Sequence, residues 1–161
     1  MSAYLFRVAR VLAAGLCVLA WPALPALAND APQKLLQRPA IAAADWANVS
    51  EVVVELNDNN YEPDDLSFKV GKPYKLVLRN IGNAVHDMVG GSFFNPETIA
   101  LWMVNTRVGR VTADNINSVY IRPKQEAELW FVPVKAGSFS FFCSISGHRE
   151  AGMEGGVKII D

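Results

Sequence analysis

The chain has 161 residues, of which 51% are hydrophobic and 19% are charged. This length and composition are typical of one globular domain with a single core. Fifteen Lys and Arg stand against sixteen Asp and Glu, and no long run of one charge occurs. The charge pattern therefore indicates neither nucleic acid nor a membrane surface as a partner.

The first 28 residues have the composition of an export signal. Arg7 and Arg10 precede an apolar stretch from Val11 to Trp21, and Ala26-Leu27-Ala28 follows as a small-x-small exit. This order predicts a secretory signal peptide, residues 1–28, and a periplasmic protein. Retention of the leader as a membrane anchor is the alternative, but the apolar stretch is shorter than the ~20 residues that a spanning helix needs.

The chain then changes from an arm to a β-rich domain. Residues 29–48 are rich in Ala, Pro and Gln, which predicts a linker or N-terminal arm. Residues 49–161 form the predicted domain, with short strands bounded by turn residues. The predicted strands are 51–56, 66–70, 74–80, 118–121, 126–132, 138–143 and 156–160. Together with a strand carrying His86, they predict an all-β sandwich of two sheets.

One segment carries a helix-start signal. Asn95-Pro96-Glu97-Thr98 offers an N-cap residue, a proline at the first helical position and an acidic first turn. This predicts a short inserted helix over 96–105. We expect its apolar residues to cap one flank of the sandwich, and a partner-docking surface formed by Trp102 and Met103 is the alternative.

Three donors suited to a soft metal follow within eleven positions near the C-terminus: Cys143, His148 and Met153. Because Cys17 leaves with the predicted leader, Cys143 has no partner for an internal disulfide. Metal ligation would protect a lone thiol in an oxidising compartment. A thiolate, imidazoles and a weak axial thioether select copper. A buried core cysteine is the alternative.

The second histidine needed for such a site is His86, which follows the predicted strand 74–80. The order His86, Cys143, His148, Met153 resembles the cupredoxins, blue type 1 copper proteins of the plastocyanin, azurin and rusticyanin type, over about residues 49–161. The resemblance implies a Greek-key sandwich holding one type 1 copper ion. It implies three strong ligands, His86, Cys143 and His148, with Met153 as the long axial ligand. Met88 is the competing thioether, because it alternates with His86 on one strand face.

Two residues depart from the pattern of the family. Asp87 stands where many relatives have Asn or Ser, and Ser146 replaces a proline often found there. A carboxylate at position 87 would accept backbone N–H bonds from the Cys143 loop, and it would favour Cu(II) if it pointed at the metal. These two differences from the family affect the expected reduction potential of the copper ion more than the choice of residues that bind it.

The resemblance implies a periplasmic one-electron carrier that is not an enzyme. Its partners would be redox proteins such as cytochromes or oxidase and reductase complexes, with electrons passing through the exposed edge of His148. A copper-binding protein for resistance or delivery is the alternative, although such proteins usually carry extra Met- or His-rich tracts. A copper oxidase or nitrite reductase needs a second metal centre, which two histidines cannot build. A Cys-His hydrolase would lack an orienting third group.

Overall fold

The computed structural model describes residues 38–113 and 115–161. The predicted signal peptide, residues 1–28, the cysteine within it, and the first part of the predicted arm lie outside the described residues. Among the residues that are described, no helix is both long enough and apolar enough to cross a membrane.

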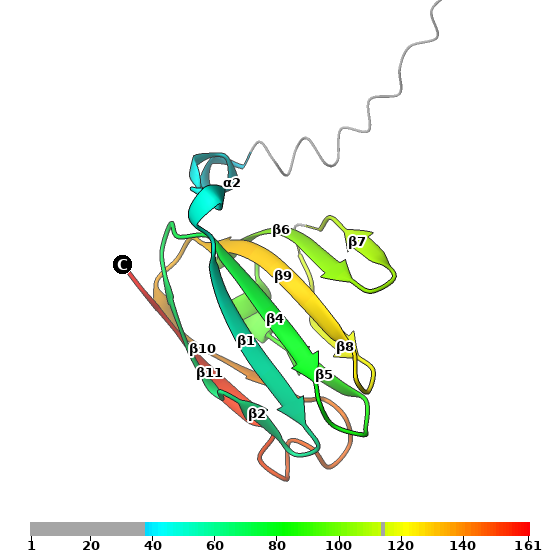
Figure 1. Cartoon of the computed structure of the whole chain (residues 1–161). Coiled ribbons are helices and arrows are strands. Elements are labelled where there is room, and N and C mark those ends of the chain that lie inside the picture. The colour runs from blue at the N-terminus through cyan, green and yellow to red at the C-terminus, as the bar shows by residue number, and fades with distance from the viewer. Residues whose placement is uncertain (1–37, 114) are drawn as a thin grey trace, which may run out of the picture.

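The described chain forms a sandwich of two sheets (Figure 1). A six-stranded sheet has the order β2-β1-β4-β9-β6-β7, and a five-stranded sheet has the order β3-β11-β10-β5-β8. The first sheet contains β1 Ser50–Asn57, β2 Asn60–Glu62, β4 Tyr74–Asn80, β6 Ile99–Thr106, β7 Gly109–Val111 and β9 Glu126–Pro133. The second contains β3 Asp65–Lys69, β5 His86–Val89, β8 Ser118–Ile121, β10 Gly137–Phe142 and β11 Glu154–Ile160. The predicted all-β sandwich is therefore confirmed, and the strands predicted by range all form.

The predicted helix over 96–105 is wrong, because this segment is the strand β6. Asn95 instead closes a turn: its carbonyl accepts the N–H groups of Thr98 at 2.8 Å and Ile99 at 3.0 Å. From Ile99 onward the chain pairs antiparallel with β9. Ile99 and Leu101 face the main core, whereas Ala100 belongs to a second buried cluster. A strand buried on both faces reads as a continuous apolar run, which periodicity alone does not separate from a helix.

Part of the predicted arm packs on the six-stranded sheet. The helix α2 (Pro39–Ala43) buries Ile41 against Ala100 and Val132, and the 3₁₀ turn η1 (Trp46–Asn48) follows it. Arg38 Nη2 donates to the carbonyl of Pro96 at 3.0 Å. Residues 38–48 therefore cover one end of the sandwich, next to the start of β6.

The core lies between the two sheets and packs against the strands that carry the predicted ligands. Aromatic rings fill its centre, with Phe68 at 5.3 Å from Phe131 and Tyr61 at 5.0 Å from Phe141 between ring centroids. A second 3₁₀ turn, η2 (Gly91–Phe94), adds two buried rings. The β4–β5 and β10–β11 loops lie at the end of the sandwich opposite α2 (Figure 1). Chain segments far apart in sequence thus meet at this end of the sandwich.

Candidate metal centre

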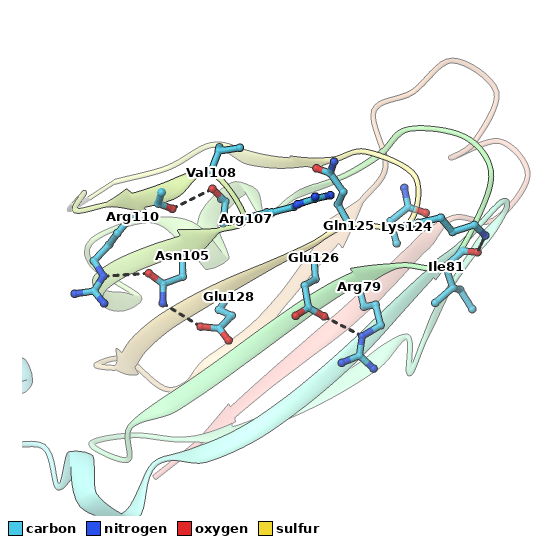
Figure 2. Close-up of a pocket in the computed structure, with 13 residues that line it drawn as sticks. Arg79, Ile81, Asn105, Arg107, Val108, Arg110, Lys124, Gln125, Glu126 and Glu128 are labelled. Carbon is cyan, nitrogen blue, oxygen red and sulfur yellow. Dashed lines mark hydrogen bonds and ion pairs between the residues drawn. The ribbon is translucent and has the colours of Figure 1, made fainter.

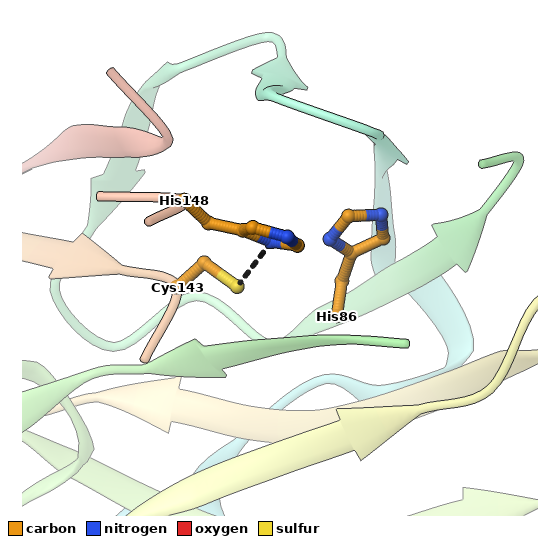
Figure 3. Close-up of side chains that lie close together, drawn as sticks. All are labelled: His86, Cys143 and His148. Carbon is orange, nitrogen blue, oxygen red and sulfur yellow. Dashed lines mark hydrogen bonds between the residues drawn. The ribbon is translucent and has the colours of Figure 1, made fainter. Parts of the chain in front are cut away.

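Three of the four predicted ligands meet at this edge of the sandwich (Figure 3). His86 is the first residue of β5, Cys143 directly follows β10, and His148 lies in the β10–β11 loop. Their donor atoms all lie within 4.8 Å of one another. The Cys143 Sγ atom is 3.5 Å from His148 Nδ1, and the two imidazole centroids are 5.0 Å apart. This is the only such group of His, Cys, Asp and Glu donors found among the described residues.

Burial makes the His86 side chain the most informative member of the cluster. Its relative exposure is 0%, and neither ring nitrogen has a hydrogen-bond partner within the described part of the chain. Leaving a buried polar group unsatisfied is costly, so such groups need an explanation, and an ion is one. A buried thiol and two imidazoles form a soft donor set that fits copper. The residues present therefore fit the metal that the sequence predicts.

The protonation properties of the cluster favour a metal over nucleophilic chemistry. Burial lowers the pKa of His86, the neighbouring His148 lowers it further, and Asp58 and Asp87 oppose this by raising it. The lowered pKa favours the neutral ring, which is the form that binds a metal. Burial raises the pKa of the Cys143 thiol. Reactive cysteines are accessible and have lowered pKa values, whereas Cys143 is fully buried. A bound metal would displace the thiol proton.

The β10–β11 loop is held by its own backbone hydrogen bonds. The N–H of Cys143 donates to the carbonyl of Met153 at 3.0 Å, and the N–H of Met153 donates to the carbonyl of His148 at 2.9 Å. Gly147 and Gly152 adopt positive φ angles of 83° and 99°, which other residues rarely tolerate. Met153 is fully buried in the same core as Cys143. Its ligation of the metal stays a prediction.

Asp87 joins the two ligand-bearing segments. Its Oδ1 accepts the N–H of Ser144 at 2.7 Å, and its Oδ2 accepts the Ser144 hydroxyl at 2.6 Å. The expectation that this carboxylate accepts an N–H bond from the Cys143 loop is therefore confirmed. Met88, two residues from His86, is fully buried in the core.

Sequence reasoning missed two residues beside the cluster. Tyr61, on the three-residue strand β2, donates its hydroxyl to the carbonyl of Asp87 at 2.5 Å, and burial raises its pKa. The Oδ1 atom of Asp58 lies 3.6 Å from His86 Nε2. Backbone N–H groups of Asn83 and Ala84 lower the pKa of Asp58. The spacing of residues in the sequence gives no sign of the contact between Asp58 and His86.

A large groove lies apart from this cluster (Figure 2). It has a volume of about 1320 Å³ and runs between the β6–β7 hairpin and the ends of β4 and β9. Its polar side chains largely pair with one another, as Arg79 does with Glu126 at 3.0 Å and Asn105 with Glu128 at 3.1 Å. No candidate ligand lines this groove.

Known proteins resemble this chain in sequence and in fold. The chain is 28% identical to the copper-resistant cuproprotein CopI of Pseudomonas aeruginosa over 161 residues, covering 83% of this chain and 87% of the relative. It is 29% identical to CopI of Rubrivivax gelatinosus over 126 residues, covering 76% and 72%. Reduced auracyanin from Roseiflexus castenholzii shares the fold, with a TM-score of 0.50 at 15% identity over 70% of this chain and 98% of that one. Residues 16–153 match the model of the cupredoxin-like domain. The chain therefore belongs to the cupredoxin-like family.

Proposed function

We propose that the protein is a periplasmic type 1 copper protein that carries single electrons between redox partners. The observation that carries this proposal is the meeting of His86, a buried ring with no hydrogen-bond partner among the described residues, with the Cys143 thiol and His148. His86, Cys143 and His148 would hold the ion, with Met153 as the axial ligand. Bound copper would supply a one-electron Cu(I)/Cu(II) couple.

The chain contributes rigidity to such a centre. His86 and Cys143 are attached to neighbouring strands, because Val89 of β5 pairs with Phe142 of β10. Asp87 adds two hydrogen bonds to Ser144, next to Cys143. Strands and a hydrogen-bonded loop hold the donor side chains, so these would move little when copper changes between Cu(I) and Cu(II). Small movement favours fast electron transfer over exchange of the metal.

The surface near His148 supports electron transfer to a partner. His148 is partly exposed, in contrast to the buried His86. The neighbouring Arg149 stacks over the ring of Phe142 at 4.2 Å and donates to Glu154 at 3.3 Å, which fixes its position. We expect a redox protein, such as a cytochrome or an oxidase or reductase complex, to dock over this partly exposed imidazole.

The first experiment tests the copper centre. The protein without residues 1–28 receives one equivalent of Cu(II), with the Cys143→Ser variant as control. We expect intense thiolate-to-copper absorption that reductant bleaches reversibly and that the control lacks. Copper bound without this band, or bound equally by the control, would remove Cys143 from the centre and overturn the proposal.

A second candidate function is copper resistance, because both curated relatives are named copper-resistant cuproproteins. The two functions differ in whether an electron or the copper ion leaves the protein. A carrier in the Cu(I) state passes its electron to ferricytochrome c within milliseconds to seconds and keeps its copper. A copper-handling protein instead yields Cu(I) to a chelator on that timescale and exchanges electrons slowly. Stopped-flow absorption of the protein band and the chelator band separates these outcomes.

Export is tested separately. Expression of the full chain in a Gram-negative host, followed by cell fractionation and N-terminal sequencing, should place a mature protein beginning at Asn29 in the periplasm. A full-length product in the membrane fraction would indicate a retained anchor.

A further inference from the structure

A charged side chain outside the predicted ligand set lies against the buried His86 ring. Asp58 Oδ1 is 3.6 Å from His86 Nε2. The Asp58 side chain is 46% exposed, whereas that of His86 is 0% exposed. Asp58 lies in the turn between β1 and β2, so it approaches the imidazole from the solvent side. At 3.6 Å the contact is electrostatic and slightly longer than a hydrogen bond.

The Asp58 carboxylate is fixed in place by the loop that carries His86. Its Oδ1 accepts the N–H of Asn83 at 2.8 Å and the N–H of Ala84 at 3.3 Å. Both donors belong to the β4–β5 loop, which leads directly into His86. The carboxylate and the ring are therefore held by the same short segment, and their separation does not depend on a free side-chain rotamer.

Gly82 provides the space in which the two groups approach each other. A Cβ atom at this position would lie 2.5 Å from Asp58 Oδ1 and 3.0 Å from His86 Nε2. Gly82 is not among the residues with positive φ, so its backbone conformation is open to any L residue. Glycine is required here because a side chain would not fit beside these two groups, and not because of the backbone conformation.

We propose that Asp58 is a positioning residue for His86, an inference that rests on the proposed copper site. A carboxylate beside Nε2 favours the tautomer with the proton on Nε2, which leaves Nδ1 as the metal-binding nitrogen. One ring nitrogen of His86 faces Cys143 and His148, and the other points away from them (Figure 3). The negative charge would also stabilise Cu(II) relative to Cu(I), and so lower the reduction potential.

The first test needs no metal. ¹⁵N chemical shifts of His86 report the tautomer ratio of the metal-free protein at pH 8, where a free imidazole is neutral. Asp58→Asn removes the charge but keeps an oxygen that can accept from Asn83 and Ala84. We expect the ratio of the Nε2–H to the Nδ1–H form to fall at least threefold in this variant. An unchanged ratio would overturn the inference.

A matched control removes the same charge at the other end of the sandwich. Glu97 is exposed and follows Pro96, whose carbonyl binds Arg38 beside α2. Glu97→Gln should leave the tautomer ratio of His86 at the wild-type value. An equal fall in Asp58→Asn and Glu97→Gln would mean that net charge, and not the contact, sets the ratio, and this would also overturn the inference.

The second test uses the copper-loaded protein. Asp58→Asn should raise the preference for Cu(I) about tenfold, which is about 59 mV for a one-electron couple. Gly82→Ala should shift the potential in the same direction, because its methyl group separates the carboxylate from the ring. Glu97→Gln should leave it unchanged.

The two proposals fail in different ways. Equal potentials in the wild type and Asp58→Asn, with the blue absorption intact, would overturn the role of Asp58 and leave the copper site standing. Absence of the blue absorption in the wild type would overturn the proposed function, and the tautomer ratio would then decide the role of Asp58.

Discussion

Ser144 donates both its backbone N–H and its hydroxyl to the carboxylate of Asp87, at 2.7 and 2.6 Å. The two residues are 57 positions apart in the chain and adjoin two different candidate ligands, Cys143 and His86. Asp87 is fully buried, and its carbonyl also accepts the hydroxyl of Tyr61 at 2.5 Å. The geometry of the donor cluster therefore depends on a buried polar contact as well as on the strands.

Removal of this contact should destabilise the metal-free protein. We expect Asp87→Ala to lower the free energy of unfolding by about 2–4 kcal/mol, because it removes the buried carboxylate that accepts both hydrogen bonds from Ser144. Ser144→Ala should cost less, since it keeps the backbone donor. In a double-mutant cycle measured by urea unfolding, the coupling should be at least about 1 kcal/mol. Additive effects of the two substitutions would show that the contact contributes little.

The axial position is tested by two matched substitutions. Met153 and Met88 are both fully buried thioethers, and Met88 alternates with the predicted ligand His86. Met153→Leu should keep the blue absorption but raise the reduction potential, because loss of a weak axial donor favours Cu(I). Met88→Leu should leave the potential unchanged. Cyclic voltammetry of both variants decides the assignment, and a shift confined to Met88→Leu would make Met88 the axial ligand.

The sequence was sufficient to predict the donor cluster, because the side-chain types that suit copper can be recognised in the sequence itself. A lone Cys143 followed by His148 at fixed spacing, with one further histidine, leaves few alternatives. The contact of Asp87 with the Cys143 loop could be anticipated for the same reason. The strand β6 could not be recognised, because Asn95-Pro96 begins a turn as readily as a helix and pairing with β9 decides between them. The contact of Asp58 with His86 depends on how two loops pack against each other, and the spacing of residues in the sequence does not predict this.

Gly155 is the second residue of β11, directly after the β10–β11 loop. Unlike Gly147 and Gly152 of that loop, it does not have a positive φ. Gly155 instead pairs with Phe141 across β10 and β11. An added Cβ would overlap the backbone carbonyl of Asp64 and the buried ring of Phe141. The conformation is ordinary, and the space is what excludes a side chain.

Gly155→Ala should therefore lower the free energy of unfolding by about 1–3 kcal/mol through overpacking. The neighbouring Gly156 is a matched control. A Cβ there would meet only the side chain of Asp65, which is exposed and able to move. Gly156→Ala should thus change stability by less than about 0.5 kcal/mol. Thermal and urea unfolding of both variants checks the prediction, and equal costs would contradict it.

Glu128 on β9 should make stability depend on pH. Its carboxylate accepts hydrogen bonds from Asn105 and from the Trp130 indole, each at 3.1 Å. Mainly through the Asn105 bond, these contacts hold the pKa of Glu128 below its usual value in the folded protein. A group with a depressed folded pKa contributes stability above its unfolded pKa, which is about 4.3. That contribution is lost as the pH falls through the lower, folded pKa.

Glu128→Gln keeps an oxygen acceptor and removes the charge, so it isolates this contribution. We expect the metal-free variant to be less stable than the wild type by about 0.5–1 kcal/mol at pH 7, a modest value because the side chain is partly exposed to solvent. The difference should shrink toward zero as the pH falls below about 4, because Glu128 of the wild type then becomes protonated. Glu97→Gln is the control. Glu97 is exposed, and no hydrogen bond to its carboxylate occurs among the described residues. Urea unfolding between pH 3 and pH 7 measures the difference. A gap between wild type and Glu128→Gln that stays constant across this range would mean that shape, and not charge, makes Glu128 stabilising.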